Sequence, residues 1–586
     1  MIKKTIEEFI AKSLKETGVT EYNVKIELTP DGHKGDFTFN SFPLAKILRK
    51  NPKIIAETLA EKLKNYDLFE TLETVQGYLN ITVDREKLFS CVLGDILKDG
   101  LNYGACDRYK GKKVMVEYSS PNTNKPQHLG HIRNNVLGMA LSNILENAGY
   151  EVIRTNLINN RGIHICKSML AYKKWGEGRE PDVKGDHFVG NYYVLFEKKY
   201  DEEYREYLKE NPGCTTSKED FFKISKSGQE AQKMLQMWED GDKETIELWE
   251  KMNNWVIDGF METYRLLGCK FDKVYLESNT YMMGKKIVLD ALDPGIVYRG
   301  DDGAVKIDLS EEGLGHKVLL RSDGTSVYMT QDIGTTVHKH EDYKTDLQFF
   351  VVGDEQNFHF KVLFSILKRL GYNFAEGCRH YSYGMINLPE GKMKSREGTV
   401  VDADELIGSL KNMVKDIMAG RDMEKDVEER ALKLALAALK FMILKINPVS
   451  TMIFNPKEAI SFEGDTGPYL LYVYVRCQHI LARAGSVNFE GINYKRLGNE
   501  EEIALVKHLS YFPELCLTVA TDYNLSVLAG YLLNLGKKFH RFYHLHDVLH
   551  QDDAELMRAR LAMIKCVRDV ISKGLKLLFI DTVEEM

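Results

Sequence analysis

Closely spaced cysteines are missing from this chain of 586 residues. Nine cysteines are present, but the closest two, Cys91 and Cys106, lie fifteen residues apart. Without a C-x-x-C pair, the sequence offers neither a typical cysteine zinc site nor a disulfide framework. This pattern is typical of a protein that works in the reducing cytoplasm, and we expect that location here.

Long apolar runs are also missing. No run approaches the ~18–20 apolar residues that a membrane-spanning helix needs. The N-terminal segment has lysines but no apolar core, and Glu7 and Glu8 lie within it, so it indicates an amphipathic helix rather than a signal peptide. We therefore expect no membrane association.

The overall charge lacks the positive excess that many nucleic-acid-binding proteins show, because the net charge is −7. The distribution is uneven, however. Residues 537–576 contain five lysines and four arginines against five acidic residues, a local net charge of +4. Such a stretch is compatible with phosphate contacts, although a solvated helix face is the simpler explanation of it taken alone.

The length of the chain predicts several domains. Residues 1–110 mix helical patterns with short strands such as 75–83, which indicates an α+β domain. Residues 111–460 alternate apolar strands with helices and glycine turns, which is typical of a parallel sheet. Residues 461–586 indicate an all-helical domain.

Two further features lie within the middle region. A charged helical stretch at about 173–262, broken at Asp240-Gly241-Asp242, indicates an insertion, and strand signals end at about residue 405, where stem helices follow. The predicted fold is thus a multidomain α/β protein. A Rossmann-like parallel-sheet catalytic domain carries the helical insertion, between an α+β N-terminal domain and an all-helical C-terminal domain.

The stretch NTNKPQHLGHIRNN, residues 122–135, lies between a short β-rich segment at 112–119 and apolar residues at helical spacing that begin after Gly130. The segment 151–158 predicts the next strand. The stretch is therefore the strand-to-helix loop of a β-α-β unit, where ligands bind in open α/β sheets. His128, Gly130 and His131 are expected at a helix N-terminus, which favours anions.

Three interpretations of this histidine pair remain open on the residues alone. A metal site lacks further good ligands nearby, since asparagine, lysine and arginine surround the pair. A plain helix cap is possible, and a phosphate site is favoured. The loop contains neither G-x-G-x-x-G nor G-K-[ST], so imidazole donors would hold the phosphate instead.

His-Leu-Gly-His after a first strand resembles the HIGH signature of class I aminoacyl-tRNA synthetases. A partner lies downstream: GKMKSREGTVV, residues 391–401, resembles that family's KMSKS loop in the form found in arginyl-tRNA synthetases. Five more segments are similar to that family in the right order: residues 30–52, 321–334, 351–360, 462–476 and 558–580.

The resemblance implies functional residues as follows. Catalytic roles fall on His128, His131, Lys125 and Lys392. Contacts with ATP fall on Pro121, Asn122, His128, Gly130, His131, Met385, Lys392 and Met393. The arginine pocket falls on Glu117, Ser119, Asn122, His131, Tyr328, Asp332 and Gln356. Contacts with tRNA are expected from Lys537, Lys538, Arg541 and Tyr543 in the C-terminal domain.

The implied reaction is ATP-dependent formation of arginyl-adenylate, followed by transfer to the terminal adenosine of tRNA(Arg), with release of AMP and pyrophosphate. Carboxylates suit a guanidinium, and imidazoles and lysines suit the charge that builds on the phosphate. Mg²⁺ is expected with the nucleotide, and no protein-held metal. The partners would be tRNA(Arg), L-arginine and ATP, and the enzyme would be a monomer. The residues that read the anticodon are not visible in the sequence.

Two departures from the family pattern bear on these roles. The second signature has Lys394 third and Ser395 fourth, so its usual second lysine is missing. Many arginyl enzymes carry a lysine just before the first signature instead, and Lys125 occupies that place, so we hypothesise that it supplies the charge. Where the family usually has Asp-Trp-Gly, this chain has Asn160-Arg161-Gly162, which leaves the role of that loop open.

Three other functions compete. A class I synthetase for another amino acid, lysine being the other cation, would share both signatures, and a nucleotidylyltransferase would share only the first. A non-catalytic RNA-binding relative would have no chemical reason to keep His128, His131 and Lys392.

Overall fold

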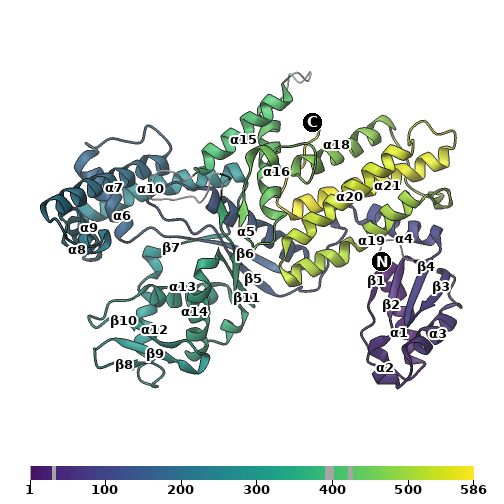
Figure 1. Ribbon diagram of the computed structural model, residues 1–586, viewed down its shortest axis with the longest axis horizontal. Coiled ribbons are helices and arrows are strands. Elements are labelled where there is room, and N and C mark those ends of the chain that lie inside the picture. Colours follow the sequence, from purple (N-terminus) through teal and green to yellow (C-terminus); the bar gives the residue numbers. More distant parts are fainter. Residues whose placement is uncertain (1, 30–33, 388, 390–400, 420–425) are drawn as a thin grey trace. The chain divides into compact units, whose positions relative to one another are not determined.

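The computed structural model describes residues 2–29, 34–387, 389, 401–419 and 426–586 (Figure 1). The chain divides into two compact units. One is Asp107–Ile460, and the other combines Met1–Cys106 with Ser461–Met586. The two units are described separately below.

A five-stranded parallel sheet forms the centre of the unit Asp107–Ile460, in the order β12-β11-β5-β6-β7. Its strands are β5 (Lys113–Glu117), β6 (Glu151–Ile158), β7 (Lys273–Leu276), β11 (Leu347–Gly353) and β12 (Cys378–Tyr383). The strand predicted at 151–158 is confirmed at both ends, and the one predicted at 112–119 is present but shorter. Strands of this kind are covered on both faces, which explains why β5 and β11 are almost continuously apolar.

Helix α5 (Leu129–Asn147) connects β5 to β6 and packs against β5, β6 and β11. Most of its side chains are buried, so it is a core helix rather than an amphipathic surface helix. A Cβ atom at Gly138 would lie 2.3 Å from Cγ of Tyr118, so only glycine allows this helix to approach the loop after β5.

Five helices follow β6 and precede β7: α6 (Ile163–Trp175), α7 (Gly185–Glu210), α8 (Lys218–Ile224), α9 (Lys226–Glu239) and α10 (Lys243–Leu267). They share an aromatic core of their own that includes Phe196, Phe221 and Phe260. The predicted break at Asp240-Gly241-Asp242 is confirmed, because α9 ends at Glu239 and the Asp242 side chain caps α10.

A second excursion between β7 and β11 was not predicted. It contains α11 (Glu277–Thr280), α12 (Met283–Asp290) and a small antiparallel sheet of β8 (Tyr298–Arg299), β9 (Val305–Leu309) and β10 (Gly315–Leu320). Helices α13 (Tyr328–Tyr343) and α14 (Asn357–Arg369) then flank β11 in the sequence and share a core with these strands. Strand β9, VKIDL, does alternate buried apolar and polar residues, but β8 has only two residues, and β10 alternates only in part.

The last part of this unit contains α15 (Ala403–Met418), α16 (Val427–Leu444) and α17 (Pro456–Ala459). The prediction that strands end at about residue 405 is wrong at one place. Strand β14 (Met452–Ile453) pairs in parallel with β13 (Ile386–Asn387). A two-residue strand forms only because it pairs with a partner distant in the sequence, so the local sequence pattern does not predict it.

The second unit begins with an antiparallel sheet in the order β1-β2-β4-β3. Its elements are α1 (Ile2–Lys15), β1 (Ile26–Leu28), β2 (Phe37–Asn40), α2 (Phe42–Leu48), α3 (Pro52–Leu63), β3 (Phe69–Val75), β4 (Tyr78–Val83) and α4 (Arg85–Asp99). The single strand predicted at 75–83 is wrong at its start. Gln76 and Gly77 have positive φ values of 50° and 100°, which makes them a two-residue hairpin turn.

The C-terminal part of this unit, the described residues 467–577, consists of helices joined by loops and contains no strand. Its helices are α18 (Gly467–Arg483), α19 (Glu500–Asp522), α20 (Leu525–Leu545) and α21 (Ala554–Leu577). Helix α19 has the length and mean hydropathy, 1.2, of a membrane span. Its apolar side chains, such as Leu509 and Phe512, are buried within the bundle, which is the behaviour of a core helix.

Candidate functional site

The two histidines of the first signature, His128–His131, form the start of α5. His128 is the N-cap, and its Nδ1 accepts a hydrogen bond from the Gly130 N–H at 3.1 Å. The His131 Nδ1 in turn accepts from the His128 N–H at 3.2 Å. The pair therefore builds a reciprocal capping box in which imidazoles replace the usual hydroxyl and carboxylate.

These bonds also determine which nitrogen carries the proton. Because each Nδ1 accepts a backbone hydrogen, each neutral ring carries its proton on Nε2 and offers that N–H as a donor. Burial and the nearby Lys125 lower the pKa of His128 to about 3, and burial with the charges of His128 and Lys125 lowers the pKa of His131 well below its usual value. At neutral pH both rings are uncharged hydrogen-bond donors.

Gly130 is required between them. A Cβ atom at this position would lie 2.9 Å from Cε1 and 3.0 Å from Nδ1 of His128. A larger residue would therefore displace the imidazole from its capping position. This contact explains physically why the third position of the pattern is a glycine.

The loop that leads to the first signature is strained. Ser119 and Ser120 have positive φ values of 78° and 46°, which non-glycine residues adopt rarely. Two hydrogen bonds stabilise Ser119 in this conformation. Its N–H donates to the Asn134 side-chain oxygen, and its hydroxyl lies 2.7 Å from the Tyr264 hydroxyl. Asn122 is exposed and pairs with Asn159 in an isolated bridge.

This loop lies at the switch point of the sheet. The chain adds β6 and β7 on one side of β5, and then β11 and β12 on the other. The crevice between β5 and β11, at the carboxyl ends of the strands, is where open α/β sheets bind ligands.

The second signature at 391–401 is only partly within the described residues. Lys392, Met393 and Lys394 lie outside them. Both flanks of that segment are described, and both bond to α5 or to the loop just before it. On the far flank the Leu129 N–H donates to the Val401 carbonyl at 3.1 Å, and the Ala403 N–H donates to the Gln127 carbonyl at 3.0 Å.

The near flank is held by Arg133 on α5. Its fully buried guanidinium donates to the carbonyls of Gly384 and Met385 at 2.7 and 2.9 Å, and to those of Pro448 and Ser450 at 3.0 and 2.8 Å. One side chain thus joins the first-signature helix to the segment that enters the second signature.

Replacing Arg133 by methionine is expected to lower the free energy of unfolding by about 3 kcal/mol, because several buried carbonyls lose their donor. Hydrogen exchange of the amides in residues 384–387 and 448–454 measures the loss. The matched control is Arg179→Met, an exposed arginine whose ion pair with Glu177 should be worth less than ~1 kcal/mol. Equal protection in both variants would contradict the anchoring role.

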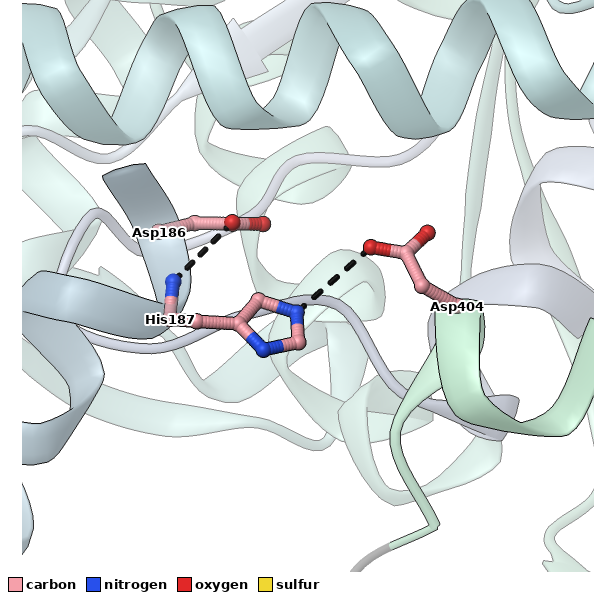
Figure 2. Close-up of side chains that lie close together, drawn as sticks. All are labelled: Asp186, His187 and Asp404. Carbon is pink, nitrogen blue, oxygen red and sulfur yellow. Dashed lines mark hydrogen bonds and ion pairs between the residues drawn. The ribbon is translucent and has the colours of Figure 1, made fainter. Parts of the chain in front are cut away.

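A second contact holds α15 just after the second signature. Lys184 bonds to the carboxylates of Asp186 and Asp404. Figure 2 shows Asp186, His187 and Asp404, with His187 Nε2 lying 3.5 Å from the Asp404 carboxylate. Burial raises the pKa of Asp404, but hydrogen bonds from His187 and Lys184 lower it on balance. Because the Lys184 ammonium already bonds to both carboxylates, this cluster is an ion-pair network between α7 and α15 rather than a good cation site.

A cavity of about 180 Å³ lies beside this network. Its lining includes Lys125, Gln127, His128, His187, Tyr193 and Asp402. Burial lowers the pKa of Lys125. A space of this volume accommodates a phosphate-sized group.

The carboxylates assigned to the arginine pocket already have partners in the protein. Glu117, at the end of β5, is buried and accepts a hydrogen bond from the Nζ of Lys339, a buried lysine on α13. Asp332, in the second turn of α13, lies 2.6 Å from Nε2 of His359. That hydrogen bond raises the pKa of His359.

Two other residues assigned to the arginine pocket are open to solvent. Tyr328 begins α13 and is 75% exposed, and Gln356 is exposed in the short helix after β11. The structure therefore places these residues at the carboxyl edge of the sheet with Glu117 and Asp332. It shows no direct bond among the described members of the set.

Sequence reasoning missed Glu277, which follows directly after β7 at the same edge. Burial raises the pKa of Glu277 to about 7, while Arg161 opposes and Asp332 adds to the rise. The four-residue strand KVYL and the single glutamate after it form no recognisable motif. The one sequence signal for Glu277 is its position directly after a strand.

The residues assigned to tRNA lie on α20. Lys537, Lys538 and Arg541 line a cleft of about 610 Å³ against α19, and Glu500 and Glu501 line its other side. Lys537 pairs with Asp465 at 2.8 Å, and Arg541 pairs with Glu501 at 3.1 Å. The ring of Tyr543 lies under the Arg476 guanidinium at 5.1 Å.

Comparison with known proteins gives concordant results. Residues 93–456 match the family described as tRNA synthetases class I (R), catalytic domain. Residues 470–586 match the DALR anticodon binding domain, and residues 1–83 match the arginyl tRNA synthetase N-terminal domain.

Whole-chain relatives agree. The chain is 43% identical to the arginine–tRNA ligase of Porphyromonas gingivalis over 98% of each chain. It is also 43% identical to that of Treponema denticola, over 96% of this chain and 95% of the relative. The solved arginyl-tRNA synthetase of Thermus thermophilus superimposes with a TM-score of 0.83 at 28% identity over 100% of both chains. The chain therefore belongs to the arginyl-tRNA synthetase family of class I aminoacyl-tRNA synthetases.

Proposed function

We propose that this chain attaches L-arginine to tRNA(Arg) in two steps at the carboxyl edge of its parallel sheet. ATP and arginine give arginyl-adenylate and pyrophosphate, and the arginyl group then passes to the terminal adenosine of the tRNA with release of AMP. The observation that carries the proposal is the neutral imidazole pair at the start of α5, with both flanks of the second signature bonded to the same helix and loop.

In the first step the arginine carboxylate attacks the α-phosphate and pyrophosphate leaves. Negative charge builds on the phosphoryl oxygens, so positioned donors and cations matter more than a base. We assign the two donors to the Nε2–H groups of His128 and His131, and the cationic charge to Lys125 and Lys392. The remaining ATP contacts would come from Pro121, Asn122, Gly130, Met385 and Met393.

Arginine recognition would use the carboxylates at the same edge. Burial raises the pKa of Glu277 and the charge of Asp332 adds to the rise, and a guanidinium bound beside both carboxylates would relieve that repulsion. Tyr328 would cover the aliphatic part of the substrate. Ser119, Asn122, His131 and Gln356 would hold its amino and carboxylate groups. Glu117, which Lys339 neutralises, would shape the pocket or bind after that pair opens.

Mg²⁺ would enter with ATP as the counter-ion of the leaving phosphates, held by the nucleotide and water. Contacts with tRNA would come from the N-terminal domain at 1–110 and from Lys537, Lys538, Arg541 and Tyr543 in the domain at 461–586. The catalytic domain would span 111–460. We propose that the enzyme works as a monomer in the cytoplasm, without a membrane.

Lys125 should carry the charge that the second signature lacks. The change Lys125→Met is expected to slow adenylate formation by about 10²-fold, because its ammonium lies beside His128 at the cavity. The change Lys394→Met is expected to cost less than about threefold. Pyrophosphate-exchange rates of the two variants compare them directly, and a larger loss for Lys394 would reverse the assignment.

Charging of tRNA tests the proposal. Purified protein, ATP, Mg²⁺ and a tRNA(Arg) transcript should incorporate labelled arginine into acid-precipitable RNA, and labelled lysine should give no incorporation. A tRNA(Lys) transcript with lysine is the control for the rival specificity. Incorporation of lysine, or none of either amino acid, would contradict the proposed function.

A further inference from the structure

The loop Asn160–Gly162 after β6 has no role in the account so far, although it departs from the usual family pattern. Its central residue, Arg161, is unusual for an arginine in a loop because only 8% of its side chain is exposed. Burying a guanidinium is costly unless it is well paired, so its partners indicate its role.

The guanidinium of Arg161 bonds to three separate parts of the catalytic unit. It stacks on the Tyr281 ring after α11 at 3.8 Å from the ring centre, and lies 5.2 Å from the Trp238 ring on α9. Its Nη2 donates to Oε1 of Glu239 at the end of α9 at 2.8 Å. The helical insertion and the segment after β7 therefore meet on this one side chain.

The third partner leads to the proposed arginine pocket. With its amide oriented so that both ends have partners, Gln331 accepts from Nη1 of Arg161 at 3.2 Å and donates to Oε1 of Glu277 at 3.2 Å. Gln331 immediately precedes Asp332 in the first turns of α13. A continuous chain of bonds thus runs from Glu239 through Arg161 and Gln331 to Glu277.

The neighbouring residue, Asn160, fixes the loop itself. Its side-chain oxygen accepts from the Ser278 N–H at 3.0 Å, and its amide donates to the Ser278 hydroxyl at 3.0 Å. Its backbone carbonyl accepts from Nε1 of Trp249 on α10 at 2.6 Å. These bonds attach the loop to both α10 and the start of α11, and they therefore fix the backbone position from which the Arg161 side chain extends.

We propose that Arg161 is a positioning residue for arginine binding, which holds Gln331 and Glu277 in place so that Asp332 and Glu277 face the substrate together. This inference rests on the proposed function and adds to it. Arg161 does not touch the substrate in this account. It acts through the bridge of Gln331 and through the positive charge that it places behind Glu277.

The charge effect has a direction that can be tested. Three groups act on Glu277: Arg161 from the loop after β6, and Gln331 and Asp332 from α13. Asp332 in turn bonds to His359 on α14. Among these groups Arg161 lowers the pKa of Glu277, against burial and Asp332. Removing Arg161 should raise that pKa further, so that a larger fraction of Glu277 is neutral at pH 7 and its full charge returns only at higher pH.

The test is steady-state charging of tRNA(Arg) by the full-length Arg161→Met variant. We expect its KM for arginine to rise about tenfold at pH 7 and by less at pH 8.5, with the KM for ATP within about twofold of the unchanged chain. Gln331→Ala should raise the KM for arginine about threefold, because it cuts the bridge and leaves the charge. The KM for arginine of Arg161→Lys should lie between those of Arg161→Met and the unchanged chain, because lysine keeps the positive charge but loses the planar stack on Tyr281.

Arg265→Met, an exposed arginine on α10, is the matched control and should leave both KM values unchanged. A merely structural role for Arg161 would lower stability and kcat without moving the KM for arginine or its pH dependence. A folded Arg161→Met variant with the KM for arginine within twofold would overturn the proposal. If that variant does not fold, unchanged values in both Arg161→Lys and Gln331→Ala would overturn it. A parent chain that charges no arginine would instead overturn the proposed function itself, and this inference with it.

Discussion

Replacing His128 by asparagine is expected to slow formation of arginyl-adenylate by about 10²–10³-fold, because one preorganised donor to the reacting phosphate is removed. The asparagine carbonyl can still accept the Gly130 N–H and cap α5, so the helix should keep its first turn. The variant therefore separates the capping role of the imidazole from its donor role.

Pyrophosphate exchange measures the loss, and thermal unfolding checks the fold. His128→Ala is the matched variant, which should lose the same rate and in addition about 1 kcal/mol of stability from the missing cap. An asparagine variant that keeps its rate within about threefold would mean that His128 is a helix cap only. The phosphate assignment would then fail for this residue.

Asp332→Asn should have the other large effect, a rise of about 10- to 100-fold in the KM for arginine with a small change in kcat. The amide keeps the shape of the side chain and a bond to His359, but it removes the negative charge that a guanidinium requires. Citrulline, the uncharged isostere of arginine, provides a second measurement. Discrimination between arginine and citrulline should fall by a similar factor.

Asp342→Asn is a matched control on the same helix, where the carboxylate accepts from the Tyr275 hydroxyl at 2.7 Å. Its KM for arginine should stay within about twofold. If Asp332→Asn behaved like this control, the guanidinium would have to be bound by other carboxylates, and the pocket would have to be reassigned.

Local patterns explain which parts of this architecture were predictable. The β5–α5–β6 unit is contiguous in the sequence, its strands are apolar, and the H-x-G-H loop joins them, so both its fold and its position were predicted. The β6 strand was predicted at Glu151–Ile158, as observed. The break before α10 was predictable because Gly241 and the capping Asp242 are local signals.

The interactions that complete the site are not local. Lys339 and Glu117 are 222 residues apart, and Arg133 reaches carbonyls 251 to 317 residues away. A buried lysine on an amphipathic helix looks like a solvated one until the packing is known. Glu277 follows a strand of four residues, and the pairing of β13 with β14 involves two residues each. No periodicity is visible over such lengths.

The central claim is that the imidazole pair and the carboxylate edge together activate arginine. ATP–pyrophosphate exchange tests it most directly, run with arginine or with lysine, each with and without tRNA(Arg). We predict exchange that depends on arginine in the presence of tRNA(Arg), no exchange with lysine, and loss of the arginine signal in His128→Asn. Exchange driven by lysine, or the absence of exchange under every condition, would contradict the account.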